Sequence, residues 1–173
     1  MDVFEAVRTV LAVRQYDSRP VPPETIEKVV EAGRLTASAM NGQPWHFVVV
    51  TERDGLEELS DAVKTGRYVR DAAFAIAVAV ERDSILAVSD ASRAIQSMIL
   101  VGWEDGVGSN WTGFRGLDAV RAALEIPDDY DVIAVLPFGY PADERLGGKK
   151  SRKPIGEVAS SERFGEPWRP SDR

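Results

Sequence analysis

The chain contains no cysteine and a single histidine, His46. Without cysteine it can form no disulfide bond, use no thiol in catalysis and bind no metal through thiolates. One imidazole is too few for a zinc site of the usual nitrogen and sulfur type, so we expect no metal centre. His46 stands in a Trp-His-Phe-Val series that is typical of a strand, which favours a packed strand residue over a catalyst.

Long apolar runs are also absent. The longest, Ala72 to Val80, has nine residues, which is about half the length of a membrane-spanning helix. The first residues lack the basic, apolar and small-residue series of a signal peptide. We therefore expect a soluble, cytoplasmic protein without a membrane partner.

Basic residues are few relative to acidic ones: the chain has 21 Lys and Arg against 28 Asp and Glu, and its net charge is −7. An acidic surface repels nucleic acid and anionic lipid, so neither is an expected partner. The basic residues gather in two islands, one near each end of the chain: Arg8, Arg14 and Arg19, and then Arg145, Lys149, Lys150, Arg152 and Lys153. Such an island is either a phosphate site built on charge-assisted hydrogen bonds or a solvated surface run.

With 173 residues and 44% hydrophobic content, the chain is long enough for one domain with one sizeable core. Apolar residues at helical spacing predict helices in the first dozen residues and over 23–34, 56–63, 89–103 and 117–124. β-branched and aromatic runs predict strands over 45–50, 74–80 and 132–138. Thr51 and Asp54 resemble a capping box before the third helix. Helices and strands intermix without a regular βαβ series, which favours an α+β fold in a single domain over residues 1–173.

The most informative segment lies between the second expected helix and the first expected strand. It places Ser38, Asn41 and Gln43, whose side chains are short hydrogen-bonding groups, beside Gly42 and Pro44. A polar loop of this kind can wrap a flat ring that is rich in heteroatoms.

This loop resembles the Pro-Ser-x-x-Asn-x-Gln-Pro-Trp element of the nitroreductase family of flavin enzymes. Further segments resemble other family elements and follow in the family's order: Ala-Val-Arg-Gln-Tyr at 12–16, Gly-Val-Gly-Ser-Asn-Trp-Thr-Gly at 106–113, Phe-Gly-Tyr-Pro at 138–141 and Lys-Ser-Arg-Lys-Pro at 150–154. No single element is decisive, but the ordered set is fairly specific. It covers roughly residues 3–165.

The resemblance implies a central, mostly antiparallel sheet flanked by helices, in a homodimer with an exchanged C-terminal segment. Residues 154–173 would be a tail that packs on the partner subunit, with Phe164 and Trp168 as apolar anchors. The resemblance also implies that FMN is bound non-covalently at the subunit interface. Electrons would pass from NADH or NADPH to a nitroaromatic, a quinone or another small acceptor. Because the flavin carries the chemistry, no side chain is expected as a catalyst.

Carried over by position, the resemblance implies a set of cofactor-binding residues: Ala12, Val13, Arg14, Ser38, Ala39, Met40, Asn41, Gln43, Val107, Gly108, Lys150 and Arg152. Arg14 would face the pyrimidine edge of the flavin, while Lys150 and Arg152 would hold its phosphate. Residues 38–43 would line the ring. The backbone at Val107 and Gly108 would approach the reactive edge.

The chain departs from the family pattern at Val10, Leu11 and Ala12, where the family has Arg or His and then Ser beside the phosphate. This departure motivates a second hypothesis, a flavin-binding module without efficient turnover. A third hypothesis is another reaction of the same superfamily, such as dehalogenation or flavin fragmentation. The residues select neither the electron acceptor nor between NADH and NADPH.

Overall fold

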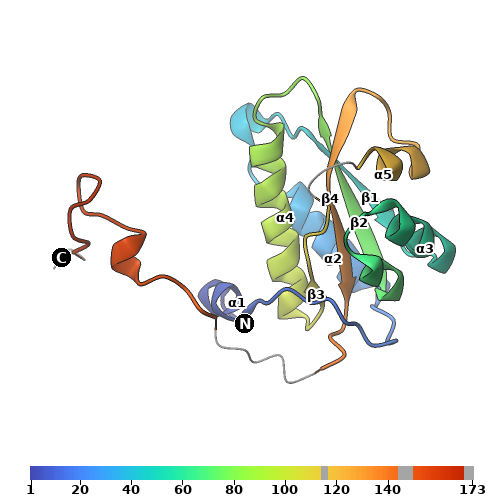
Figure 1. Ribbon diagram of the computed structural model, residues 1–173, viewed down its shortest axis with the longest axis horizontal. Helices are drawn as coiled ribbons and strands as arrows, with labels where there is room; N and C mark the ends of the chain where they lie inside the picture. Colours follow the sequence, from blue (N-terminus) through green and yellow to red (C-terminus); the bar gives the residue numbers. More distant parts are fainter. Residues whose placement is uncertain (114–116, 144–149, 170–173) are drawn as a thin grey trace.

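The computed structural model describes residues 1–113, 117–143 and 150–169 (Figure 1). Its elements, in chain order, are α1 (Val3–Thr9), α2 (Pro23–Arg34), the 3-10 turn η1 (Ala39–Asn41), β1 (Trp45–Val50), α3 (Arg53–Ala62), η2 (Arg67–Asp71), β2 (Phe74–Glu81), α4 (Ala87–Glu104), β3 (Gly108–Ser109), α5 (Asp118–Ala123), β4 (Tyr130–Gly139) and η3 (Ile155–Glu157). The expected α+β class is confirmed.

The four strands form one sheet in the order β1-β2-β4-β3, and every neighbouring pair is antiparallel. This confirms the mostly antiparallel sheet. β2 lies inside the sheet and is buried from Phe74 to Val80, as its unbroken apolar sequence requires. An apolar run without polar alternation is typical of a strand that is covered on both faces.

Helices cover both faces of the sheet, with α2 and α4 on one side and α3 and α5 on the other (Figure 1). Side chains of β2 divide between the two layers, because successive residues of a strand point to opposite faces. Phe74 and Ile76 pack in the α2–α4 layer, where the Phe74 ring stacks on Phe138 at 4.9 Å between centroids. Ala75 and Ala77 pack in the α3–α5 layer.

The first turns of α2 and α3 differ from each other. α2 begins at Pro23, where a missing backbone N–H costs nothing. The expected capping box of Thr51 and Asp54 is wrong. α3 has Glu52 as its N-cap, and no side chain caps it. Because α3 starts at Arg53, Thr51 lies one position too early to reach the free N–H groups of the first turn.

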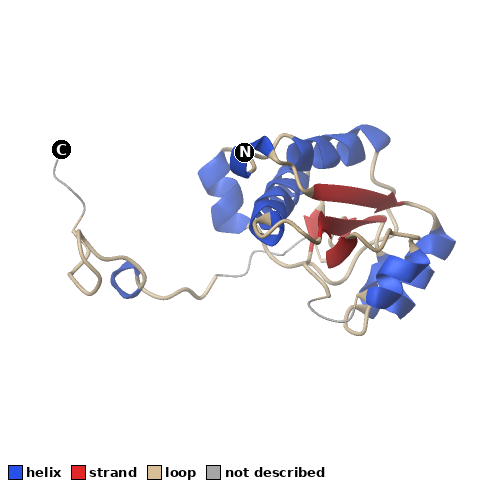
Figure 2. Cartoon of the chain, turned by 90° about the horizontal axis from the view of Figure 1, so that it is seen from above, coloured by secondary structure: helices blue, strands red, loops and turns tan. Residues whose placement is uncertain are grey.

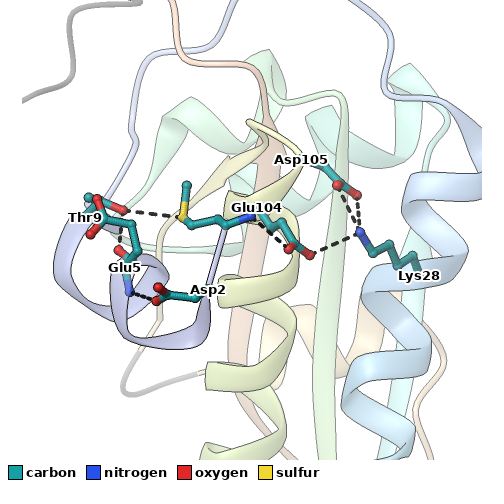
Figure 3. Close-up of polar contacts among 7 residues, drawn as sticks. Asp2, Glu5, Thr9, Lys28, Glu104 and Asp105 are labelled. Atoms are coloured by element: carbon teal, nitrogen blue, oxygen red, sulfur yellow. Dashed lines mark hydrogen bonds and ion pairs between the residues drawn. The ribbon is translucent and has the colours of Figure 1, made fainter.

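A polar network joins α1 and α2 to the C-terminal end of α4 (Figure 3). Glu104 Oε1 lies 3.5 Å from the N-terminal amine of Met1, and Lys28 Nζ donates to Glu104 at 3.4 Å and to Asp105 at 3.0 Å. On α1 itself, Asp2 accepts a hydrogen bond from the backbone N–H of Glu5 at 2.7 Å. These contacts hold the short helix α1 beside the last turn of α4.

The segment from Lys150 onward runs away from the sheet and its helices (Figures 1 and 2). Several of its apolar side chains face solvent, including Ile155, Val158 and Phe164. Within the described part of the chain, no helix is both long enough and apolar enough to span a bilayer.

Candidate functional site

Arg14 lies on an extended segment whose backbone is fixed on both sides. Before it, the Val13 N–H donates to the Ser109 carbonyl at 2.9 Å, and Ala12 forms a parallel bridge with Ser109. After it, the Gln15 carbonyl accepts from the Ala142 N–H at 3.0 Å. The Arg14 side chain is exposed and makes no hydrogen bond or ion pair with any described residue. A guanidinium is thus held on a rigid support while its own donors stay available.

The side-chain hydroxyl of Tyr16 links this segment to β4. It donates to the Val13 carbonyl at 2.8 Å and lies 3.2 Å from the Pro137 carbonyl of β4. Burial raises the pKa of Tyr16 far above its ordinary value; Tyr68 raises it further, and the Arg14 cation lowers it. The phenol therefore stays a neutral donor. The ring rests on Gly139, where an added Cβ would come within 2.9 Å of it.

A cavity of about 790 Å³ opens beside Arg14. Its walls come from the connector after Arg14, from the start of α3 and from η2, and include Tyr16, Arg53, Arg70 and Asp71. The volume is in the usual range for a site that takes a small organic ligand.

Buried polar groups gather next to this segment. Five polar or charged residues are buried in the described part of the chain, and Ser109, Asn110 and Thr112 are three of them. Asn110 Nδ2 donates to the Tyr68 hydroxyl at 2.6 Å, and Thr112 Oγ1 donates to the Thr65 carbonyl. Ser109 Oγ is buried and has no hydrogen-bond partner among the described residues, which is a rare condition in a native protein.

The residues Tyr68, Ser109 and Asn110 were missed by the sequence analysis. Ser109 and Asn110 stand inside a glycine-rich segment, and such a segment reads as an exposed loop. The available signal was the position of Ser109 and Asn110 between the apolar Val107 and Trp111, a few residues after an apolar helix.

Val107 and Gly108 lie next to residues 12–16, which we call the Arg14 segment. Val107 belongs to the main hydrophobic cluster and is fully buried. A Cβ added at Gly108 would lie 2.8 Å from the Val13 Cβ, so the missing side chain makes room for Val13. The structure thus brings Ala12, Val13 and Arg14 together with Val107 and Gly108.

Lys150 and Arg152 form a cationic cluster with Arg8. Lys150 Nζ donates to the Val7 carbonyl near the end of α1 at 2.7 Å. Burial lowers the pKa of Lys150, and the charges of Arg152 and Arg8 lower it further. Arg8 has a carboxylate neighbour in Glu5 at 2.6 Å. Among the described residues, the hydrogen bond of Arg152 is to the adjacent Ser151 carbonyl. Arg145 and Lys149 of the same island lie outside the described residues.

The 38–43 loop is compact and its backbone is strained. Met40, Asn41 and Gln43 all have positive φ, at 50°, 57° and 50°. Only asparagine of these types adopts that region readily, and such strain gathers at functional sites. Ser38 Oγ accepts from the Gln43 N–H at 2.9 Å, while Met40 and Asn41 point their side chains to solvent.

This loop and the Arg14 segment lie at opposite ends of α4. The Ala39 N–H donates at 3.0 Å to Asp90, in the first turn of α4. β3, which holds the Arg14 segment, follows the last turn of that helix (Figure 1). Since α4 has 18 residues, its ends are about 27 Å apart. One chain therefore does not bring the two halves of the expected set together.

His46 and the acidic residues give no sign of a metal centre. His46 is exposed on β1, with Tyr130 edge-on at 6.4 Å. Across residues 1–113, 117–143 and 150–169, no group of three or more His, Cys, Asp or Glu side chains is placed to hold a metal ion.

Known proteins resemble this chain in both sequence and fold. The model of the "Nitroreductase family" matches residues 8–67 and 65–140. A protein of Methanothermobacter thermautotrophicus named "Putative NADH dehydrogenase/NAD(P)H nitroreductase" is 36% identical over an alignment of 151 residues that covers 83% of this chain and 79% of that protein. A solved structure of the same name from Bacteroides thetaiotaomicron has a TM-score of 0.85 at 26% identity, with 93% of this chain and 97% of that chain covered. A "putative nitroreductase in complex with FMN" from Desulfovibrio desulfuricans has a TM-score of 0.80 at 26% identity, with 95% and 98% covered. The chain belongs to the nitroreductase family.

Proposed function

We propose that this protein is an FMN-dependent oxidoreductase that passes electrons from NADH or NADPH to a small acceptor such as a nitroaromatic or a quinone. Family membership, the NAD(P)H nitroreductase name of the Methanothermobacter relative and the FMN complex of a similar structure support this function. Bound FMN supplies the redox chemistry, and the protein supplies its binding, orientation and electrostatic environment.

The residues present fit an anionic flavin. The Arg14 guanidinium has no described partner, and Lys150 lies with Arg152 in a cluster of like charge. Arg14, Lys150 and Arg152 keep hydrogen-bond donors that could bind a ligand with a phosphate and a polar ring edge.

Arg14 is the observation that carries the proposal. A guanidinium at the ring edge stabilises negative charge there, and the backbone on both sides of Arg14 is already held, at Val13 by Ser109 and at Gln15 by Ala142. Reduction of the ring places negative charge on its pyrimidine edge. Arg14 therefore makes reduction by a nicotinamide donor more favourable.

We infer that the complete site lies between two copies of the chain. The 38–43 loop of one protomer would meet the Arg14 segment of the other, since α4 separates them within one chain. Solvent-facing apolar side chains at both ends of the chain support a dimer: Val3, Phe4 and Val7 on α1, and Ile155, Val158 and Phe164 in the tail. The tail would pack on the partner subunit.

The first experiment is a titration of the purified protein with FMN, followed by anaerobic addition of NADH or NADPH. We expect submicromolar to micromolar binding and bleaching of the bound flavin by at least one donor. Arg14→Ala should weaken binding of reduced FMN roughly tenfold or more, because a hydrogen bond to a charged group is worth about 1.5–3 kcal/mol. Arg82→Ala is the matched control, since Arg82 pairs with Asp131 at 2.6 Å on the exposed surface.

The cationic cluster has its own test. Arg152→Ala should weaken the binding of FMN but leave the affinity for riboflavin, which has no phosphate, unchanged. Arg163→Ala, another arginine of the tail segment, is the control. Equal loss of FMN and riboflavin would place Arg152 away from the phosphate.

Donor addition also decides between an enzyme and a flavin-binding module. Flavin that stays oxidised with both NADH and NADPH would favour the module, which the residues at Val10, Leu11 and Ala12 first suggested. Bleaching followed by recovery on addition of a quinone or a nitroaromatic supports turnover and identifies the acceptor class.

A further inference from the structure

The side chains of Tyr68 and Asn110 form a pair that the family resemblance does not assign. Asn110 Nδ2 donates to the Tyr68 hydroxyl at 2.6 Å and to the Trp111 carbonyl at 3.1 Å. Asn110 is only 7% exposed. A buried amide that gives both of its donors to fixed acceptors has no freedom to turn, so it fixes the position of the Tyr68 oxygen.

The two segments that carry this pair are tied together at a second point. Thr112 Oγ1 donates to the Thr65 carbonyl. The Thr112 backbone exchanges hydrogen bonds of 3.0 and 2.9 Å with Val135 of β4. Gly66, with φ at 124°, makes the turn that leads into η2. Tyr68 is therefore held against the sheet by the backbone on one side and by Asn110 on the other.

The hydroxyl proton of Tyr68 is free to serve a ligand. A neutral phenol has one O–H donor and an oxygen that accepts. Asn110 occupies the oxygen as a donor, so the Tyr68 proton has to point away from Asn110. Within the described residues the Tyr68 hydroxyl donates to nothing.

Tyr68 lies on the Arg14 side of the molecule. Ser109, the neighbour of Asn110, holds the residue before Arg14. Arg70 and Asp71, which follow Tyr68 in η2, line the same 790 Å³ cavity as Arg14. Tyr68 and Arg14 both act electrostatically on the pKa of Tyr16, so both side chains lie near the Tyr16 hydroxyl.

We propose that Tyr68, held by Asn110, is a second hydrogen-bond donor to the ring edge that Arg14 faces. This inference rests on the proposed function and deepens it. The ligand is a planar heteroaromatic ring whose carbonyl edge gains negative charge on reduction. A hydrogen bond strengthens when its acceptor becomes charged, so Tyr68 favours the reduced ring over the oxidised one and raises its reduction potential.

The test compares the affinities of the apoprotein for oxidised FMN and, without oxygen, for chemically reduced FMN. In the Tyr68→Phe variant, the preference for reduced over oxidised FMN should fall about tenfold. This corresponds to a reduction potential of bound FMN that is lower by about 30 mV for a two-electron couple. Asn110→Ala should lower the same preference by a smaller factor, and should add nothing in the Tyr68→Phe background. Tyr130→Phe is the matched control. Tyr130 is the first residue of β4, whereas Gly139 at the other end of β4 pairs with Gly108 of β3, and the Tyr130 ring lies edge-on to His46.

The outcomes separate this proposal from its alternatives. Equal weakening of both forms of FMN in Tyr68→Phe overturns it, since a packing role gives no redox preference. An unchanged ratio with a raised KM for a quinone also overturns it and places Tyr68 at the acceptor. A wild-type protein that binds neither form defeats the proposed function instead. Circular dichroism of each apoprotein shows which variants are folded, and Asn110→Ala carries the test if Tyr68→Phe is not.

Discussion

Gly108 is the position where a single added methyl group tests how the Arg14 segment is held. A Cβ built on Gly108 lies 2.8 Å from Val13 Cβ and 3.3 Å from Val13 Cγ1. Val13 cannot retreat easily. Its side chain is 2% exposed, its N–H is bonded to Ser109, and a β-branched residue has few rotamers to choose from. The Gly108→Ala variant must therefore shift either β3 or the segment that carries Arg14.

Overpacking of this kind costs about 1–3 kcal/mol. In a protein of this size each kcal/mol lowers Tm by about 2–4 °C. The melting temperature of the Gly108→Ala apoprotein should thus fall by about 2–12 °C. FMN should also bind more weakly, although the substitution adds and removes no charge, because Arg14 moves with Val13.

Thermal unfolding followed by circular dichroism measures the first effect, and fluorescence titration with FMN measures the second. Gly156→Ala is the control, since a Cβ there meets nothing within 4 Å. The double variant Gly108→Ala with Val13→Ala restores the space, so its loss should be smaller than the sum of the two single losses. A Gly108→Ala protein that melts like the wild type and binds FMN equally well would refute the close packing of these two segments.

Further predictions concern charge, the loop, the core and the tail. Because the pKa of Lys150 is depressed, the free protein loses this charge at a lower pH than an ordinary lysine does. FMN affinity should fall as pH rises through that window, and Lys150→Met should abolish the fall in a pH series of titrations. Asp90→Ala should cost about 1–3 kcal/mol, since it leaves the Ala39 N–H unpaired; faster hydrogen exchange of the loop would report it. Met98→Ala, at a fully buried position, should cost about 2–5 kcal/mol in urea unfolding. Deletion of residues 154–173 should shift the protein from dimer to monomer in light scattering, and an unchanged mass would exclude a tail that holds the dimer.

The long periodic segments were predictable because local chemistry decides them. The helix expected over 89–103 is Ala87–Glu104, and the strand expected over 132–138 is Tyr130–Gly139. Thr51 shows the limit of such reasoning. A capping motif depends on the residue at which the helix starts, and α3 starts at Arg53 with Glu52 as its N-cap.

The site was predictable only as a set of residues. Resemblance named Arg14 and the 38–43 loop, but sequence spacing does not say that α4 separates them by its full length. Nor does it say that the empty side of Gly108 faces Val13. The pairing of Tyr68 with Asn110 is a tertiary contact across 42 positions of sequence, and no local pattern encodes it.

Charge pairing separates the cations that can bind a ligand from those that serve the surface. In the described part of the chain, seven arginines lie within ion-pair distance of a carboxylate: Arg8, Arg19, Arg34, Arg70, Arg82, Arg93 and Arg121. Acidic residues outnumber basic ones by 28 to 21, so partners are plentiful. Arg14 and Arg152 are among the described arginines that form no ion pair with a described carboxylate. A phosphate or a reduced ring can bind them without first breaking an internal pair, whereas a ligand at Arg8 has to compete with Glu5. In this acidic chain, we therefore expect anion binding at cations that are not already paired, and Arg14, which has a cavity beside it, is the foremost of them.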